Sequence, residues 1–350
     1  NLPYGLISPL DDGGAPDAGD WQRYVMPYLG YNWLRVPWFF AETYFYRRVL
    51  AITGYFQEGP GQGVDPYRYQ KQQGLETTRQ AVRALAGRLL GWLHAPGLDR
   101  HVLTRLLTLA LWGNQSDLSL WPADVEDRSA QVDEGRRPER LLVDEVDAVV
   151  EHIAGLDGRP ARLDFIVDNA GFELVCDLAL SDYLLGSGAA ASVWVHVKSH
   201  PTFVSDAMAG DVHDTVAFLA GDGDPASRAF GTRLADHLDA GRLVLVDHFF
   251  WTSPLAGWEM PPALRKHLAG SALVVSKGDA NYRRFLGDRH WPHTTPFADV
   301  VGYFPAPLLV LRTCKSEVGV GLPPGRAEQA TAQDPDWLVN GQWGMIQFRA

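Results

Sequence analysis

The chain has 350 residues, and 42 acidic against 31 basic residues give it a formal net charge of −11 at neutral pH. This charge argues against broad contact with nucleic acid or with an anionic membrane, although a small basic pocket could still hold a phosphate. Two cysteines exclude a disulfide framework, and neither a signal-peptide pattern nor an apolar run of about 20 residues is present, so we expect a reducing, cytoplasmic setting.

Residues 1–150 are predicted to form an α-helical domain, which begins with an irregular lead-in rich in Pro, Gly and Asp. Helical, aromatic-rich segments follow, among them VPWFFAETYFYRRVL and HVLTRLLTLALW. Glu42, Arg47 and Arg48 lie inside the first of these, where we expect a solvated face or an internal ion pair. Asn114 and Asp117 follow the second and are expected to be turn residues.

A second domain, residues 151–350, is predicted to follow a charged linker over residues 126–139 and a helix over residues 144–154. Short apolar segments there alternate with amphipathic helices such as residues 226–240 and 262–269. The predicted strands span residues 162–167, 192–197, 242–246, 272–276, 308–312 and 345–348. This alternation predicts an α/β fold, in which an αβα sandwich contains a mainly parallel, Rossmann-like sheet covered on both faces.

Residues 162–185 combine a predicted strand, a tight turn and a helix, and the turn carries Asp168, Asn169 and Gly171. One interpretation is that Asp168 and Asn169 are turn formers or helix caps, as these residue types often are. The other is a hard-metal site, because a carboxylate beside an amide carbonyl suits Mg²⁺ or Mn²⁺. Ligands of open α/β sheets bind outside the carboxyl ends of the strands, which is where this turn would lie.

Charged and amide side chains follow four of the predicted strands, and in a parallel sheet those four turns meet along one edge. In chain order they are Asp168 and Asn169, then Lys198 and Asp206, then Lys277, Asp279, Asn281 and Arg283, then Arg312 and Lys315. Carboxylates and an amide beside fixed positive charges are how proteins bind and activate phosphoryl groups. The pattern therefore predicts a metal site that handles phosphate.

Four segments, FIVDNAGFELVCDLALSDYLL, HPTFVSDA, VSKGDANYRRFLGDRHW and LRTCKSE, resemble the DUF89 family of metal-dependent damage-control phosphatases. The resemblance is closest to its acidic-residue-methyltransferase-1-like branch (subfamily III, with a terminal R-T-x-K motif), and it also takes in VPWFFAETYFYRR and WGNQSDLS. It implies a helical N-terminal domain on an αβα domain, with the site at their junction. Activities known in this branch are hydrolysis of fructose 1-phosphate, fructose 6-phosphate and related sugar phosphates, and a SAM-dependent carboxyl O-methyltransferase activity has been proposed for a relative.

The resemblance also implies roles for individual residues. A divalent metal (Mn²⁺, Co²⁺, Ni²⁺ or Mg²⁺) would be held by Asp168, Asn169 and Asp206, while Lys277 would sit beside the phosphate of a small phosphate ester. Substrate contacts would come from Glu173, Asp279, Asn281, Arg283, Arg312 and Lys315. Each of these positions matches the family pattern.

From these residues we predict a mechanism in which the metal polarises the phosphate ester and lowers the pKa of a water molecule. Lys277 and a second basic residue would neutralise charge on the phosphoryl oxygens, and Asp206 or Asp279 would orient the water or protonate the leaving alkoxide. Attack by water is favoured over attack by Asp168, because the D-x-D pattern of phosphatases with an aspartyl nucleophile is absent.

Two other functions stay open. A SAM-dependent methyltransferase would want a glycine-rich turn after its first strand, whereas the turn found here, Asp-Asn-Ala-Gly, suits a cation better. A non-catalytic sugar-phosphate sensor on the same fold would bind its ligand without turnover. His248, His290 and His293 lack the spacing of a zinc-binding helix, and we expect them to be structural.

Overall fold

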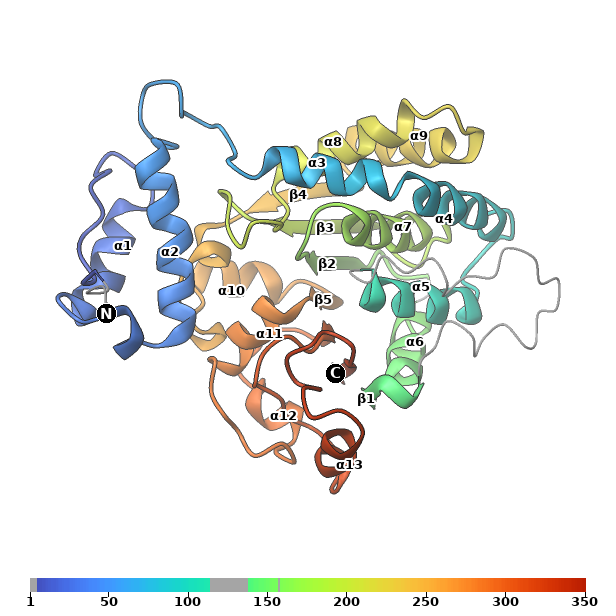
Figure 1. Cartoon of the computed structure of the whole chain (residues 1–350). Helices are drawn as coiled ribbons and strands as arrows, with labels where there is room; N and C mark the ends of the chain where they lie inside the picture. Colours follow the sequence, from blue (N-terminus) through green and yellow to red (C-terminus); the bar gives the residue numbers. More distant parts are fainter. Residues whose placement is uncertain (1–4, 114–137, 157) are drawn as a thin grey trace.

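The computed structural model describes residues 5–113, 138–156 and 158–350. A seven-stranded sheet lies at its centre. Its strands run in the order β1-β7-β6-β5-β2-β3-β4. The succession β5, β2, β3, β4 can be followed in Figure 1. They are β1 (Leu141–Asp144), β2 (Arg162–Ile166), β3 (Ser192–Val197), β4 (Leu243–Asp247), β5 (Leu273–Lys277), β6 (Leu308–Thr313) and β7 (Gly344–Arg349). β7 is antiparallel to β6, and every other neighbouring pair is parallel. The predicted α/β class with a mainly parallel sheet is confirmed.

All six predicted strands are present, each within one residue of its expected bounds. β1 was not predicted, because a strand of four residues is too short to show an alternating pattern. It lies at the edge of the sheet and pairs with β7, just before α6 (Val146–Ala154), the helix expected over residues 144–154. Asn114, Asp117 and residues 126–137 of the expected linker lie outside the described residues.

Helices cover both faces of the sheet. One core joins Phe165 and Val195 to α4 (Arg79–Trp92), α5 (Arg100–Trp112), α6, α7 (Phe172–Gly186), α8 (Ala209–Ala220) and α9 (Pro225–Asp239). A second core joins Ile166 and Val310 to α10 (Pro262–Leu268), α11 (Asp279–Leu286), α12 (Phe297–Val300) and α13 (Arg326–Gln333). The neighbours Phe165 and Ile166 enter different cores because successive strand residues point to opposite faces.

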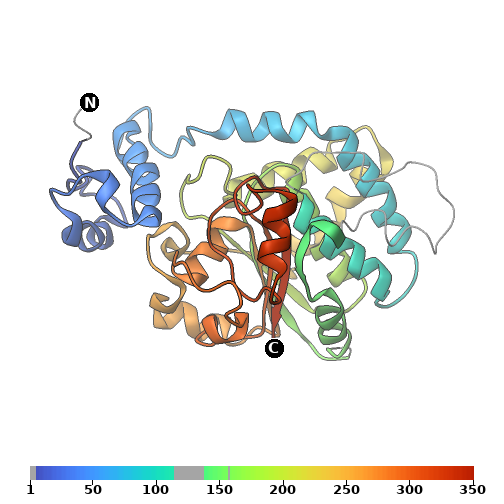
Figure 2. The ribbon, with the colours of Figure 1, turned by 60° about the horizontal axis from the view of Figure 1, so that its bottom comes forward.

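The N-terminal helices α1 (Ala18–Val25) and α2 (Trp38–Thr53) form a unit with its own small core, made by Ile7, Trp21, Val25, Phe40 and Tyr44. From this unit, α3 (Arg68–Thr77) leads back to α4 and the sheet (Figure 2). The predicted domain boundary at residue 150 stays a prediction, and α4 and α5, which precede it, share the core of the sheet.

The carboxyl ends of β2, β3, β5 and β6 lie at one edge of the sheet, because these strands are mutually parallel.

Short 3₁₀ helices occur in the connections: η1 (Met26–Tyr28), η2 (Trp33–Arg35), η4 (Pro138–Arg140), η5 (Phe249–Thr252) and η6 (Gly257–Glu259). Within the described residues, every helix is too short or too polar to cross a membrane.

Candidate active site

Asp168 and Asp206 lie side by side where β2 ends. The backbone N–H of Ala207 donates to the Asp168 carbonyl at 2.8 Å, and that of Ala170 donates to the Ser205 carbonyl at 2.7 Å. These bonds make an isolated antiparallel bridge between Asn169 and Asp206. The turn after β2 and the loop after β3 are thus hydrogen-bonded to each other, which brings the buried carboxylates of Asp168 and Asp206 close together.

Burial of this carboxylate pair has an electrostatic cost. The pKa of Asp168 is raised well above its usual value by burial and by the negative charges of Asp206 and Glu173. Burial also raises the pKa of Asp206, against the opposing charge of Lys198. Among the described residues, Oδ1 of Asp168 has no hydrogen-bond partner although it is buried. A dication would relieve both the repulsion and the unpaired oxygen, so these residues fit a divalent metal.

Asn169 adds an amide to the pair. Its Nδ2 donates to Asp168 Oδ2 and to Glu173 Oε2, both at 2.9 Å, and its Oδ1 accepts from the Ser205 hydroxyl. The nitrogen therefore faces Asp168 in this structure, whereas a cation bound by that carboxylate would favour the amide oxygen there. Glu173, in the first turn of α7, fixes the amide from the other side.

Gly278 makes the close approach of β5 to this turn possible. It has φ +82°, and a Cβ atom at this position would lie 1.9 Å from Oδ2 of Asp168. Only glycine meets both conditions, since other residues avoid this backbone region and carry the Cβ atom that would collide. Gly278 was not among the predicted site residues, although a glycine in or beside a strand can mark a close approach of backbone.

The predicted cation Lys277 points toward α7 and α5. Its Nζ donates to the Ala110 carbonyl and lies 3.1 Å from Glu173 Oε1 and 3.2 Å from Asp177 Oδ1. Burial disfavours the charged amine, but the two carboxylates outweigh burial and raise the pKa of Lys277. Its placement beside a phosphate stays a prediction.

Lys198 is the cation that the structure places against the aspartate pair. Its Nζ lies 3.2 Å from Asp206 Oδ2 and 3.4 Å from both Asn281 Oδ1 and the Trp251 carbonyl. The side chain is almost fully buried. The sequence pattern placed Lys198 among the positive charges expected at this edge of the sheet but did not single it out as a site residue. Its position directly after the strand was the available signal.

Asp279 and Arg312 hold the loop after β6 in place. Arg312 is fully buried, donates to Asp279 Oδ1 at 2.7 Å and also reaches the Ser316 and Val318 carbonyls. Asp279 accepts further bonds from the Lys315 N–H at 3.2 Å and the Ser316 hydroxyl at 3.1 Å. The two predicted substrate residues therefore have contacts that position the backbone of Lys315.

Asn281 and Arg283 are bound to neighbouring elements as well. The amide of Asn281 donates to the carbonyls of Val167 and Lys277, at 3.3 and 2.8 Å, and so ties α11 to the ends of β2 and β5. Arg283 forms ion pairs with Glu42 of α2 at 2.6 Å and with Asp288 at 2.8 Å.

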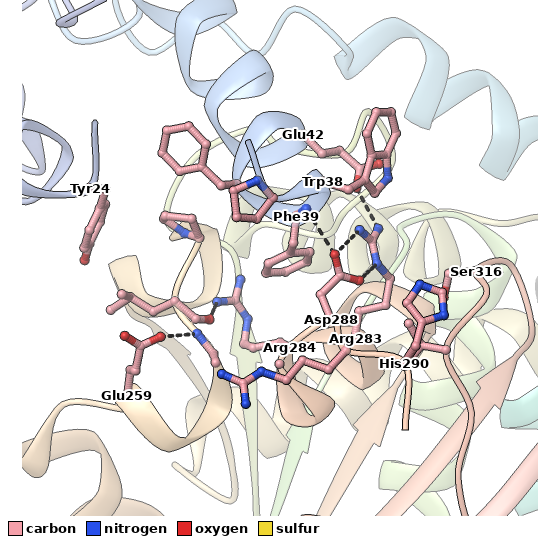
Figure 3. A pocket seen from close by; sticks show the side chains of 18 of the residues that line it. Tyr24, Trp38, Phe39, Glu42, Glu259, Arg283, Arg284, Asp288, His290 and Ser316 are labelled. Carbon is pink, nitrogen blue, oxygen red and sulfur yellow. Dashed lines mark hydrogen bonds and ion pairs between the residues drawn. The ribbon is translucent and has the colours of Figure 1, made fainter. Parts of the chain in front are cut away.

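A cavity of about 980 Å³ lies between the N-terminal helices and the α11 end of the sheet (Figure 3). Arg283, Arg284 and Lys315 supply positive charge to its wall, and Trp38 and Phe39 supply aromatic surface. Arg284 is fully buried against backbone carbonyls, and burial lowers its pKa to about 9. The positive charge of Lys315 also lowers the pKa of Asp168, against the larger raising effects of burial, Asp206 and Glu173.

Two of the three predicted structural histidines have structural contacts. The Phe250 N–H donates to Nδ1 of His248, which caps η5, and Nδ1 of His293 hydrogen-bonds to the Gly319 carbonyl at 2.9 Å. His290 lines the cavity.

Comparison with known proteins places this chain among phosphatase enzymes. It is 34% identical over 331 residues to the Damage-control phosphatase ARMT1 of Mus musculus, which covers 91% of this chain and 75% of that protein. The relative of the same name from Danio rerio is 35% identical over 334 residues, with 91% and 74% covered. The one from Homo sapiens is 33% identical over 338 residues, with 91% and 75% covered.

The family description "Damage-control phosphatase ARMT1-like domain" matches residues 10–330, and the chain belongs to this family. A solved structure of a DUF89 family protein from Pyrococcus horikoshii has a TM-score of 0.47 and 12% identity, covering 96% of this chain and 92% of that one. The family and the enzyme class predicted from the sequence are both confirmed.

Proposed function

We propose that this enzyme hydrolyses small phosphomonoesters with the help of a divalent metal, and that sugar phosphates such as fructose 1-phosphate or fructose 6-phosphate are its substrates. The observation that carries the proposal is the buried pair Asp168 and Asp206, with an unpartnered carboxylate oxygen among the described residues and Lys198 alongside. All the candidate ligand atoms of Asp168, Asn169 and Asp206 are oxygens, the donor type that suits Mg²⁺, Mn²⁺, Co²⁺ or Ni²⁺. Bound there, the metal would supply positive charge that polarises the ester.

The chain's own cations would then bind the phosphoryl group. Lys198 is held by Asp206 and Asn281, so its charge is fixed before a substrate arrives. The loop that Arg312 positions holds the backbone of Lys315, whose exposed side chain adds a second positive charge. Fixed charges stabilise a transition state better than mobile ones, because they need no reorganisation during the reaction. The organic part of the ester would occupy the cavity beside Arg283, against its aromatic wall.

Asp206 is our choice for the group that orients the attacking water. Asp279, the other candidate, already accepts bonds from Arg312, Lys315 and Ser316 on one oxygen. Asp206 has Lys198 on one oxygen and lies next to Asp168, where the ester phosphate would sit. We retain attack by water over attack by Asp168.

A phosphate-release screen tests this proposal. The enzyme is stripped with EDTA and then given sugar phosphates with Mg²⁺, Mn²⁺, Co²⁺ or Ni²⁺. We expect metal-dependent release, lost in Asp168→Ala and Asp206→Ala and retained in Asp239→Ala, an exposed aspartate at the end of α9. Binding of a sugar phosphate without release under every metal would instead support a sensor. Methyl transfer from SAM without phosphate release would support the methyltransferase alternative.

A further inference from the structure

A cluster of potential metal ligands lies on the sheet away from the aspartate pair of the candidate active site. Asp164 of β2, His196 of β3 and His267 of α10 each offer one ligand atom, and these atoms all lie within 4.8 Å of one another. Oδ1 of Asp164 is 2.8 Å from Nε2 of His196 and 3.5 Å from Nε2 of His267. The two imidazole rings are 5.5 Å apart at 74°.

One of these separations already matches that of a tetrahedral metal centre. Zinc–nitrogen and zinc–oxygen bonds are about 2.0–2.2 Å long, which puts neighbouring ligand atoms of a tetrahedron about 3.3–3.6 Å apart. The His267 contact already has this length, and the His196 contact is shorter because an N–H now bridges the two atoms. Small side-chain movements would open room for an ion.

The charges of the cluster also suit a cation. The Asp164 side chain is fully buried; burial raises its pKa, but the bond from His196 and the charge of Arg162 outweigh burial, so that the pKa lies below its usual value. Arg162 donates to Oδ2 at 2.8 Å, which leaves Oδ1 for the imidazoles. Burial lowers the pKa of His267, which favours the neutral imidazole that binds a metal.

Two features set the expected affinity. His267 is 25% exposed, which gives an ion access from solvent and leaves a side for a water ligand, while His196 is fully buried. When Nε2 of His196 binds a metal, its proton moves to Nδ1, which has no hydrogen-bond partner among the described residues. That buried N–H and the nearby Arg162 charge both weaken binding, so a moderate affinity is expected.

We propose that Asp164, His196 and His267 form a second cation site, selective for a borderline transition-metal ion such as Zn²⁺. Two imidazoles and one carboxylate favour Zn²⁺ over Mg²⁺, whereas the oxygen donors of the aspartate pair do not. Occupation would tie α10 to β2 and β3. A metal bound to His196 would also contact the surroundings of Trp251, because the Trp251 ring packs edge-on against His196. The Trp251 carbonyl in turn contacts Lys198.

The test counts zinc on the full chain by equilibrium dialysis in excess Mg²⁺, which occupies oxygen sites. We expect one Zn²⁺ per chain that Mg²⁺ does not displace, with affinity at least about tenfold weaker in His267→Ala. His213→Ala, which removes an exposed histidine on α8, should bind zinc as the wild type does. Bound Co²⁺ should give the strong visible absorption of a tetrahedral nitrogen-containing site in the wild type and lose it in His267→Ala.

Folding is checked separately by the melting temperature of the metal-free variants, which should match the wild type because His267 is partly exposed. In the same excess of Mg²⁺, zinc should raise the melting temperature of the wild type and of Asp168→Ala, but not of His267→Ala. Zinc binding that survives in His267→Ala and disappears in Asp168→Ala would place the ion at the aspartate pair and overturn the proposal. Absence of Mg²⁺-resistant zinc from the wild type would overturn it equally.

Discussion

At the scale of single residues, the candidate site depends on how closely backbone and carboxylate can approach. Gly278 lets β5 pass within van der Waals reach of Asp168, and the aspartate pair is held by backbone bonds from Ala170 and Ala207. Lys198 compensates the charge of that pair from the end of β3. Each residue can be tested with a variant that separates site geometry from stability.

Gly278→Ala should lower kcat by about 100-fold, because its Cβ would displace the Asp168 carboxylate by an ångström or more. Gly188→Ala is the matched control, since Gly188 has a similar φ of +78° but no other atom within 4 Å of the place that a Cβ would take. Backbone strain should cost Gly188→Ala about 1–2 kcal/mol of stability. It should cost Gly278→Ala about 1–3 kcal/mol, because φ +82° with ψ 172° is a region that essentially only glycine adopts. Steady-state kinetics and urea denaturation measure the two effects; equal activity in both variants would contradict the close contact.

Lys198→Met should lower kcat by about 100-fold without weakening metal binding, because it removes a positive charge next to the dication. Lys266→Met, which changes an exposed lysine on α10, should leave both quantities unchanged. Kinetics and a metal titration by calorimetry check this. Weaker metal binding in Lys198→Met would show that the lysine builds the site instead of acting on the substrate.

At the scale of elements, α7 and β5 are joined by a buried group of charges. Glu173 and Asp177 of α7 both form ion pairs with the ammonium of Lys277, the last residue of β5. Burial and the negative charge of Glu173 raise the pKa of Asp177 against the lowering effect of Lys277, and the net result is a pKa of about 7. Two carboxylates facing one cation inside a core cannot both ionise without cost.

Asp177→Asn should therefore gain stability relative to the wild type as the pH rises. The folded-state pKa of Asp177, about 7, exceeds its unfolded value of about 3.9. The protonated carboxyl therefore contributes its full stability to the wild type below about pH 4, and this contribution is lost as the pH rises toward 7. The asparagine cannot titrate. Urea denaturation of both proteins at several pH values between these limits measures the difference, and a difference that stays constant would show that the carboxyl does not titrate there.

At the scale of the whole molecule, the N-terminal unit has its own core yet forms one wall of the cavity. It meets α11 and the turn after that helix through the ion pair of Arg283 with Glu42 and the bond from the Phe39 N–H to Asp288 (Figure 3). Inside the unit, the fully buried Arg47 binds Asp12 and Asp17, both at 2.7 Å. Loss of the Arg47 guanidinium would leave the buried carboxylates of Asp12 and Asp17 without this positive charge.

Arg47→Met should destabilise the N-terminal unit by about 3–5 kcal/mol, the usual cost of breaking a buried ion pair from one side. Amides of α1 and α2 should then exchange hydrogen faster, while those of α7 and the sheet keep their protection, because the cores are separate. Arg48→Met, at the next and partly exposed position, should have a small effect. Hydrogen exchange with mass spectrometry resolves the regions, and uniform acceleration would mean that the unit and the sheet unfold together.

The strands, their parallel arrangement and the meeting of four turns at one edge were predictable from the sequence, because apolar runs of strand length and the residues that follow them are local features. The resemblance of long segments such as VSKGDANYRRFLGDRHW identified the family for the same reason. β1 escaped prediction because four residues carry too little pattern, and its pairing with β7 is a contact between distant parts of the chain.

Only the tertiary structure decided which of several lysines faces the aspartate pair. Lys198 and Lys277 both end strands of one sheet, and their sequence contexts look alike, but Lys277 meets Asp177 and Glu173 of α7 while Lys198 meets Asp206. A side chain's partners depend on which helix packs over its strand and at what register, and that is a property of the packed core. The sequence by itself determined which groups could reach the site; packing determined which of them do.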